Sequence, residues 1–208
     1  MNIWKYYKQT FHRNLLEKIL LENKNLITGR IIDIGSKNRR YDHFFPDSEI
    51  IAIDKNAKTG ADVSFGDIEK ELSFENNSFD SVLCLEVFEY LKNIDKALKE
   101  IGRILKPSGF AFISLPFLYH EHGDNQRLTK TFLSSKLKEF SESKIIKIGN
   151  GWTVIWDILR KKFFYNHSSF LKKIIFIFLL PFLAFIKIFH LDKVEDNYYS
   201  GLFIILKK

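Results

Sequence analysis

The chain has 208 residues, enough for one sizeable core but short for two separate domains, and its 46% apolar and 27% charged residues exclude wholesale disorder. The single cysteine, Cys84, excludes a disulfide framework and a cysteine-based zinc site. The formal net charge of +7 is spread along the chain, which suits anionic surfaces or substrates without identifying nucleic acid or membrane.

The N-terminal part of the chain is predicted to be helical. Residues 1–17 lack the long apolar core of a secretory signal, so we expect a cytoplasmic protein. Apolar residues recur at helical spacing within Tyr6–Leu26, which predicts an amphipathic helix, and Gly29 then interrupts the pattern. We therefore expect an N-terminal helical segment over residues 1–28, followed by one domain over 29–208.

Beyond Gly29, short strand-like runs alternate with helical patterns. The predicted strands are Arg30–Ile34, Ile50–Ile53, Ala61–Phe65, Phe79–Leu85 and Phe110–Leu115. A helix is predicted over Asn93–Leu105, ended by the turn residues Lys106-Pro107-Ser108-Gly109. This alternation favours an α/β fold, in which helices cover both faces of a parallel sheet.

Two of the predicted strands end in an acid. The run Ile31-Ile32-Asp33-Ile34-Gly35-Ser36 places Asp33 and Gly35 at the end of the first strand, and Asp54 ends the second. Ligands of open α/β sheets bind beyond the carboxyl ends of the strands, where a carboxylate can accept hydrogen bonds from ribose hydroxyls. A nucleoside ligand is therefore expected. The missing G-x-G-x-x-G spacing argues against a dinucleotide with a pyrophosphate, such as NAD.

Three further segments follow in order: Gly66-Asp67-Ile68, Phe79 to Leu91, and Arg103 to Phe110. Together with the two acids, they resemble class I S-adenosylmethionine-dependent methyltransferases, particularly the type 11-like family related to ubiquinone methylases. The resemblance runs from Asp33 to Phe117. It implies a Rossmann-like, doubly wound, mostly parallel seven-stranded sheet with an antiparallel last strand, and S-adenosyl-L-methionine as cofactor.

The resemblance also implies roles for residues at the strand ends. Those expected around the methionine part of the cofactor are Asp33, Gly35 and Ser36. Leu85 and Glu86, at the end of the fourth strand, would lie near the sulfonium and the reaction centre.

On the nucleoside side, the resemblance implies that Asp54 holds the ribose hydroxyls, with Lys55 beside it over the adenine. Asp67 and Ile68 would meet the edge and face of the adenine. The alternative for Asp67 is a purely structural role as a helix cap.

The sequence departs from the family pattern at two positions. Lys37 stands where the second glycine of the loop is expected, and a lysine adopts a positive φ less readily than a glycine. Glu89-Tyr90 replaces the more usual Glu-His and removes one proton acceptor. Both departures motivate an alternative function, a catalytically inactive methyltransferase-fold protein that serves as a binding or scaffold partner.

A polar segment, Leu115 to Thr129, follows the fifth strand. It is similar to the His…Asp…Arg-x-Thr segment of a methyltransferase subgroup associated with bacterial surface-polysaccharide synthesis. The resemblance places this loop over the acceptor, where His120 or His122 would act as general base and Arg127 would bind an anionic group. Two alternatives are a solvated loop, with Arg127 paired to Asp124 and Thr129 capping a helix Lys130–Phe140, and a metal site of His120, His122 and Asp124.

An apolar insertion is predicted at about 152–197, between two antiparallel last strands, Lys144–Ile148 and Gly201–Lys207. Its run Ile174–Ile186 is shorter than the roughly 20 residues of a spanning helix and contains Pro181, so a simple transmembrane helix is not expected. Two interpretations remain: a buried or homodimer-forming helix, or peripheral membrane contact through 160–190. The basic-aromatic Arg160–Tyr165 favours the second.

The predicted function is O-methylation of a small-molecule, glycan or lipid-linked saccharide acceptor, by a cytoplasmic protein at the inner face of a membrane. Nucleic acid is not an expected partner, because the sequence lacks an Asn-Pro-Pro-Tyr-type motif and an evident base-stacking platform.

Overall fold

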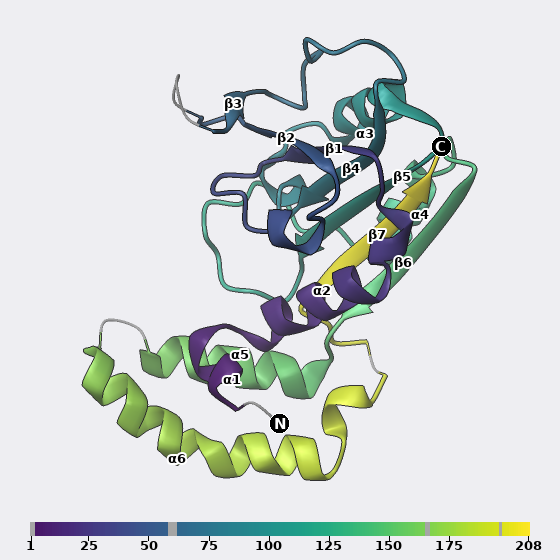
Figure 1. Cartoon of the computed structure of the whole chain (residues 1–208). Coiled ribbons are helices and arrows are strands. Elements are labelled where there is room, and N and C mark those ends of the chain that lie inside the picture. The colour runs from purple at the N-terminus through teal and green to yellow at the C-terminus, as the bar shows by residue number, and fades with distance from the viewer. Residues whose placement is uncertain (1–2, 58–61, 165–166, 196) are drawn as a thin grey trace.

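The structure, a computed structural model, describes residues 3–57, 62–164, 167–195 and 197–208 (Figure 1). Seven strands form one sheet in the order β3-β2-β1-β4-β5-β7-β6. They are β1 (Arg30–Ile34), β2 (Glu49–Asp54), β3 (Ser64–Phe65), β4 (Phe79–Leu85), β5 (Leu105–Pro116), β6 (Glu142–Ile148) and β7 (Gly201–Lys207). β7 runs antiparallel to both of its neighbours, β5 and β6, whereas β1 to β5 pair in parallel. The predicted Rossmann-like sheet with an antiparallel last strand is confirmed.

Most predicted strands lie where expected, and β1 and β4 have the predicted bounds. The third is shorter than predicted, since β3 covers only Ser64–Phe65, and Ala61 lies outside the described residues. The prediction that Lys106–Gly109 form a turn before the fifth strand was wrong. β5 already begins at Leu105, which pairs with Phe79, and the pairing resumes at Phe110 with Ser81. The turn residues therefore form a bulge inside the strand.

The helices are α1 (Trp4–Lys8), α2 (Phe11–Glu22), α3 (Ile94–Ile104), α4 (Lys130–Lys136), α5 (Gly151–Phe164) and α6 (Ser169–Ile188). Four short 3-10 helices, η1 (Lys24–Leu26), η2 (Asp42–Phe44), η3 (Phe88–Tyr90) and η4 (Leu191–Lys193), complete the elements of the described residues. The single helix predicted over Tyr6–Leu26 is divided, because Thr10 caps α2 by accepting a hydrogen bond from the Arg13 amide at 3.1 Å.

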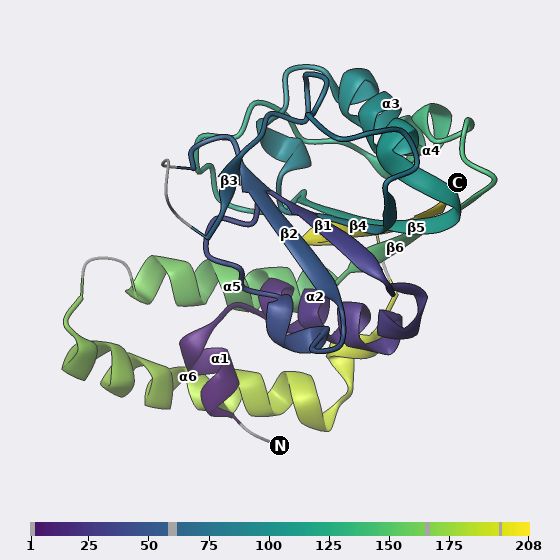
Figure 2. The same ribbon diagram turned by 45° about the horizontal axis from the view of Figure 1, so that its top comes forward.

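Helices cover both faces of the sheet (Figures 1 and 2). On one face, α3 and α4 pack on the strands through buried residues such as Ile101 and Leu133. On the other, Leu16 and Leu20 of α2 pack against Ile31 of β1 and its neighbours. Successive strand residues point to opposite faces, so each buried parallel strand is apolar on both.

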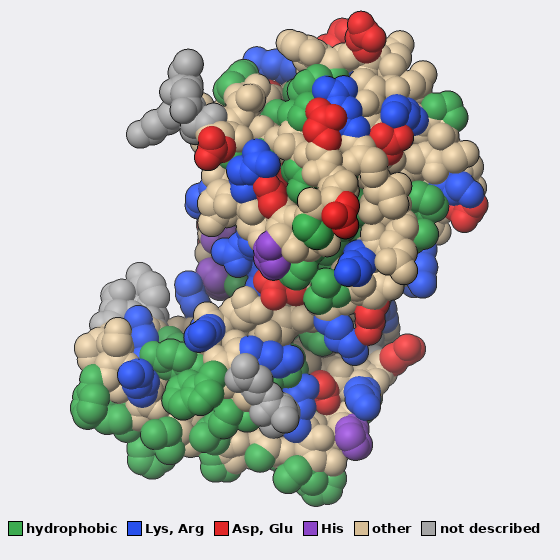
Figure 3. Space-filling model, in the orientation of Figure 1, with side chains coloured by type: hydrophobic (Ala, Val, Ile, Leu, Met, Phe, Trp, Pro, Cys, Tyr) green, Lys and Arg blue, Asp and Glu red, His purple; other side chains and the backbone are tan. Residues whose placement is uncertain are grey.

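A third layer lies beyond α2. Here α5 and α6, the two helices between β6 and β7, pack with α1 and the start of α2 around Trp156, Phe11 and Phe176, all three fully buried (Figure 2). Pro181 lies inside α6 without ending it, so the apolar segment forms one helix of 20 residues and is longer than predicted. Among the described residues, one helix, α6, is long and apolar enough to span a membrane, with a mean hydropathy of 2.2. Its apolar side chains gather along one edge of the molecule in Figure 3.

Candidate active site

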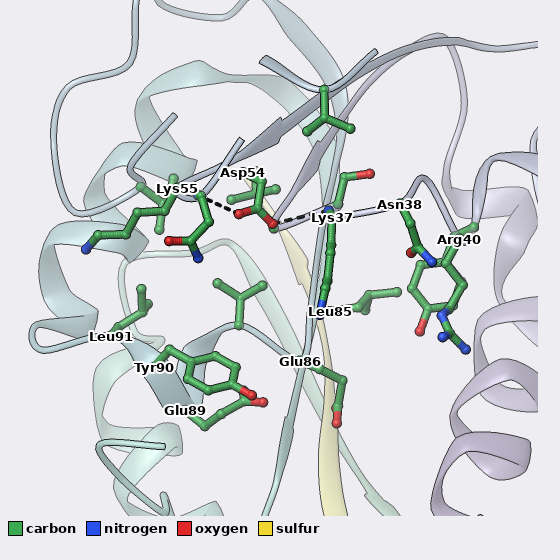
Figure 4. Close-up of a pocket in the computed structure, with 18 of the residues that line it drawn as sticks. Lys37, Asn38, Arg40, Asp54, Lys55, Leu85, Glu86, Glu89, Tyr90 and Leu91 are labelled. Atoms are coloured by element: carbon green, nitrogen blue, oxygen red, sulfur yellow. Dashed lines mark hydrogen bonds between the residues drawn. The ribbon is translucent and has the colours of Figure 1, made fainter. Parts of the chain in front are cut away.

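A cavity of about 890 Å³ opens at the carboxyl ends of the parallel strands (Figure 4). Its walls come from the segments that follow β1, β2, β3, β4 and β5, and from the first turn of α2. This position, at the crevice where the strand order reverses, is the usual ligand site of an open α/β sheet. Its size suits a small-molecule ligand.

The turn after β1 brings backbone close to the cavity. Gly35 has a φ of +73°, and a Cβ added there would lie 2.3 Å from Cγ2 of Val87. The amides of Gly35 and Ser36 both donate to the Ile53 carbonyl, at 2.8 and 3.0 Å, which fixes the turn against β2. Glycine is therefore required here for conformation and for space.

Lys37 adopts the left-handed conformation that the family pattern assigns to a glycine, with a φ of +49°. Its amide donates to Oδ2 of Asp54 at 3.2 Å, and the Asn56 amide donates to Oδ1 at 2.7 Å (Figure 4). The lysine thus keeps the turn that we expected it to disfavour. Each oxygen of Asp54 retains acceptor capacity, so the carboxylate is oriented but can still bind hydroxyls.

Lys55, Asp67 and Ile68 form the next part of the wall. Nζ of Lys55 lies 3.2 Å from Oδ2 of Asp67 and 3.7 Å from Oε2 of Glu69. Oδ1 of Asp67 accepts a hydrogen bond from the Glu69 amide at 3.1 Å. This bond closes a local turn and does not cap a helix. The alternative role predicted for Asp67, a helix cap, was therefore wrong.

Asp33 is buried behind this wall. It is 3% exposed, and its Oδ2 has no hydrogen-bond partner among the described residues. Burial raises the pKa of Asp33 to about 7. An orphaned buried carboxyl next to a ligand cavity fits a cationic or N–H donor ligand, because such groups are otherwise paired. Ser36, three residues on, lines the cavity directly.

At the end of β4, Leu85 and Glu86 both line the cavity. Glu86 has a φ of +60°, and its Oε1 accepts a hydrogen bond from the Ser114 hydroxyl at 2.8 Å. Its Oε2 lies 3.0 Å from Nε2 of His12, whose Nδ1 is 2.9 Å from the Ser200 hydroxyl. Burial alone would raise the pKa of Glu86, but His12 and the hydrogen bonds hold it well below its ordinary value. Glu86 is thus a fixed carboxylate at neutral pH.

Glu89 and Tyr90 also line the cavity, on the same side as Glu86 and across from Asp54 and Lys55 in Figure 4. Glu89 is 1% exposed, and its Oε2 is unpaired within the described part of the chain. Burial and the nearby Glu86 raise the pKa of Glu89 well above its ordinary range. The imidazole that the sequence lacks after Glu89 comes from elsewhere: Nε2 of His122 lies 3.7 Å from Oε1 of Glu89, and its ring meets Tyr90 edge-on at 5.5 Å.

The loop after β5 supplies both His120 and His122 to the cavity wall. Nδ1 of His122 lies 3.0 Å from the His120 carbonyl and 3.1 Å from Oδ1 of Asp124. Both of these partners are acceptors and lie closer to Nδ1 than the donor Nη2 of Arg127, at 3.5 Å, so we assign the proton to Nδ1, which leaves the lone pair on Nε2. The described residues hold no group of three side chains placed to bind a metal ion.

Arg127 clamps this loop from outside the cavity wall. Its Nε donates to Oδ2 of Asp124 at 2.6 Å, and Nη1 donates to the Phe117 carbonyl at 3.1 Å. The bond from Arg127 lowers the pKa of Asp124 to about 2. Thr129 caps α4 by accepting from the Phe132 amide at 3.2 Å. The Arg127–Asp124 pair and the Thr129 cap of the solvated-loop interpretation are therefore both present, in a loop that also borders the cavity.

The residues of the wall that sequence reasoning missed include His12 and Arg13 on α2, Tyr41 after β1, and Tyr119 after β5. The guanidinium of Arg13 donates to the Tyr41 hydroxyl. One signal for His12 existed, because it is a polar residue on the apolar face of α2 and is only 2% exposed.

Comparisons with known proteins agree with this geometry. Residues 43–113 match the family model described as a methyltransferase domain. A methyltransferase from Archaeoglobus fulgidus has a TM-score of 0.61 at 15% identity, covering 99% of this chain and 98% of the other. Phosphoethanolamine N-methyltransferase 2 from Haemonchus contortus has a TM-score of 0.57 at 17% identity, covering 93% of this chain. No curated protein matches the sequence.

The overall fold is therefore that of class I methyltransferases. The chain spans about half of the Haemonchus enzyme, 52% of its length, so that enzyme's activity does not transfer directly. The [4+2]-cyclase SpnF matches as well, with a TM-score of 0.56 at 14% identity, covering 93% of this chain and 80% of the cyclase. One fold thus hosts different reactions, and the reaction must be argued from the site.

Proposed function

We propose that the protein is an S-adenosylmethionine-dependent methyltransferase that methylates a hydroxyl oxygen of a small-molecule, glycan or lipid-linked saccharide acceptor. The observation that carries the proposal is the constellation at the ends of β1 and β2, where the Gly35 turn and the oriented carboxylate of Asp54 line one cavity and the orphaned carboxyl of Asp33 lies behind its wall. The surface-polysaccharide subgroup suggested by the loop after β5 belongs to the same proposal.

The residues present fit the cofactor. Asp54 would accept the two ribose hydroxyls, and Ile68, 3% exposed, would offer an apolar surface to the adenine. The fixed Glu86 carboxylate provides negative charge for the cationic methionine part, and the orphaned Asp33 carboxyl is a hydrogen-bonding group behind the same wall. When bound, S-adenosylmethionine supplies an electrophilic methyl group on a positively charged sulfur. The cavity is near the upper end of the usual range for ligand sites, which leaves room for an acceptor.

His122 is the residue we assign as general base for the acceptor hydroxyl. Its Nδ1 is held by Asp124 and the His120 carbonyl, so the lone pair of Nε2, 3.7 Å from Oε1 of Glu89, can accept the proton that the hydroxyl loses. Arg127 acts through Asp124 as a positioning residue instead of binding the acceptor directly. Methyl transfer is a direct displacement, in which alignment supplies much of the rate and the base supplies the remainder.

The first test is calorimetric titration with S-adenosylmethionine and S-adenosylhomocysteine. We expect binding by the wild type and a loss of about 100-fold or more in Asp54→Ala, because two hydrogen bonds to a charged group are removed. Asp54→Asn, which keeps one acceptor oxygen for the loop, separates loss of binding from collapse of the turn. Asp47→Ala, on an exposed acid outside the cavity wall, is the matched control. A folded wild type that binds neither compound refutes the proposal.

A positive titration leads to an acceptor search with radiolabelled cofactor. We expect label in the glycan or lipid-linked saccharide fraction of cell extracts and none in nucleic acid. The alternative, an inactive binding or scaffold protein, is favoured by one observation: the Lys37 amide already occupies part of Asp54. That alternative predicts a folded protein without cofactor affinity.

A further inference from the structure

Apart from Lys173 near its start, the side of α6 that faces away from the protein is predominantly apolar. We call this surface the α6 outer face. Its members are Phe170, Ile177, Phe178, Phe185, Ile188 and the adjoining Phe189, which are between 42% and 79% exposed. Figure 3 shows hydrophobic side chains gathered along the edge of the molecule formed by α6. Contiguous exposed apolar patches of this kind mark interaction sites on soluble domains.

The opposite side of α6 is part of the protein core. Phe176, Leu183 and Ile186 are fully buried, and the ring of Phe176 packs on Trp156 of α5 at 6.2 Å. Crossing a bilayer would require α6 to leave this cluster and expose Trp156 and Phe11, both 0% exposed, to water. The packing therefore favours a helix that lies on a surface over one that spans it.

The charge of the α5–α6 hairpin is strongly one-sided. Residues 151–188 contain six Lys or Arg and one acid, Asp157, which is buried. Lys161 and Lys162 lie at the end of α5, and Lys172 and Lys173 at the start of α6, so four of the basic residues gather at one end of the hairpin. A second copy docked on the same face would bring like charges together. Anionic lipid headgroups would complement them.

The hairpin is also tied to the cavity. The Asp157 carboxylate of α5 accepts hydrogen bonds from the amides of Phe11 and His12 at 2.6 and 2.9 Å, which caps the start of α2. His12 in turn holds Glu86 in the cavity wall. Burial and the positive charge of Lys161 both lower the pKa of His120, which indicates that the basic end of α5 lies near this wall.

We propose that the α6 outer face docks the protein on an anionic membrane surface, with the four lysines at the headgroups and the aromatic strip at the acyl boundary. This docking sets the cavity rim close to the bilayer, where a lipid-linked acceptor resides. The proposal concerns binding, so it stands or falls separately from the methyltransferase proposal.

The test is sedimentation of the full chain with vesicles of three parts phosphatidylcholine to one part phosphatidylglycerol. We expect wild-type protein to bind these vesicles, with weaker binding in high salt. The double variant Phe178→Asp/Ile188→Asp should bind the vesicles about ten-fold or more weakly, because two apolar side chains are no longer buried in the membrane interface. Phe65→Asp, at an equally exposed phenylalanine (69%) on β3, is the matched control and should bind as wild type.

Lys172→Gln with Lys173→Gln should weaken binding to the anionic vesicles by about five-fold per lysine, equivalent to about 1 kcal/mol each, and leave binding to pure phosphatidylcholine unchanged. Three results would overturn the proposal. One is the absence of binding to any vesicle. Another is a wild-type dimer that Phe178→Asp converts to monomer, which would assign the face to a second copy. The last is membrane-bound protein that resists alkaline carbonate, which would indicate a spanning helix.

Discussion

Substitution of Gly35 by alanine gives the sharpest test of the turn that forms the cavity. A non-glycine residue at a φ of +73° costs about 1–2 kcal/mol, and an added Cβ 2.3 Å from Cγ2 of Val87 adds an overpacking cost of about 1–3 kcal/mol. We therefore expect Gly35→Ala to lower the free energy of unfolding by about 2–5 kcal/mol. Binding of S-adenosylmethionine should weaken as well, because the turn must shift away from Val87.

The two costs separate in a double-mutant cycle measured by urea unfolding. Val87→Ala removes the methyl group that clashes, so the double variant should recover about 1–3 kcal/mol while keeping the conformational cost. Gly123→Ala is the control, since Gly123 has a φ of +86° but nothing within 4 Å of an added Cβ, and it should cost only about 1 kcal/mol. Strict additivity of Gly35→Ala and Val87→Ala would refute the close approach of this turn to Val87.

Three further predictions concern the polar groups of the cavity. His122→Gln should lower methyl transfer about 100-fold or more with cofactor affinity unchanged, whereas His120→Gln should have a smaller effect; equal losses would contradict the assignment of Nε2 as base. The raised pKa of Asp33, about 7 against about 3.9 unfolded, means that the folded protein holds a proton that the unfolded chain has lost, so stability falls as pH rises from about 4 to about 7. Asp33→Asn should remove this loss, on the order of 4 kcal/mol at most, in urea midpoints measured at pH 5 and pH 8. His12→Ala should lower the free energy of unfolding by about 2–4 kcal/mol, because it leaves Oε2 of the buried Glu86 carboxylate without its partner. His12→Gln should restore part of this loss, whereas an unchanged stability in His12→Ala would show that water replaces the imidazole.

The fold was predictable because its central strands are buried on both faces. β1 and β4 are apolar runs whose bounds the sequence predicts correctly, and the Asn93 cap fixes the start of α3 by accepting from the Lys96 amide at 3.2 Å. The sequence did not predict the division between α1 and α2 or the bulge in β5. Both depend on local capping and strand register, which periodicity does not record.

The acids of the site were predictable because topology brings the carboxyl ends of parallel strands to one edge, as it does for Asp33 and Asp54. The place of His12 was not, because 74 residues separate it from Glu86 and only the packing of α2 on the sheet joins them. The sequence does predict His122 in the loop over the site, but not its contact with Glu89, which also depends on tertiary packing. Such pairs are made by tertiary contacts that leave no periodic signal.

The position of β7 in the sheet also determines when the sheet can assemble during synthesis. β7 lies between β5 and β6, so β6 has no partner in the sheet until residues 201–207 have left the ribosome. Ser200, which anchors His12, emerges at the same late stage. Until then the nascent chain carries an unpaired edge on β5, which favours contact with other chains before the cavity wall around His12 is complete.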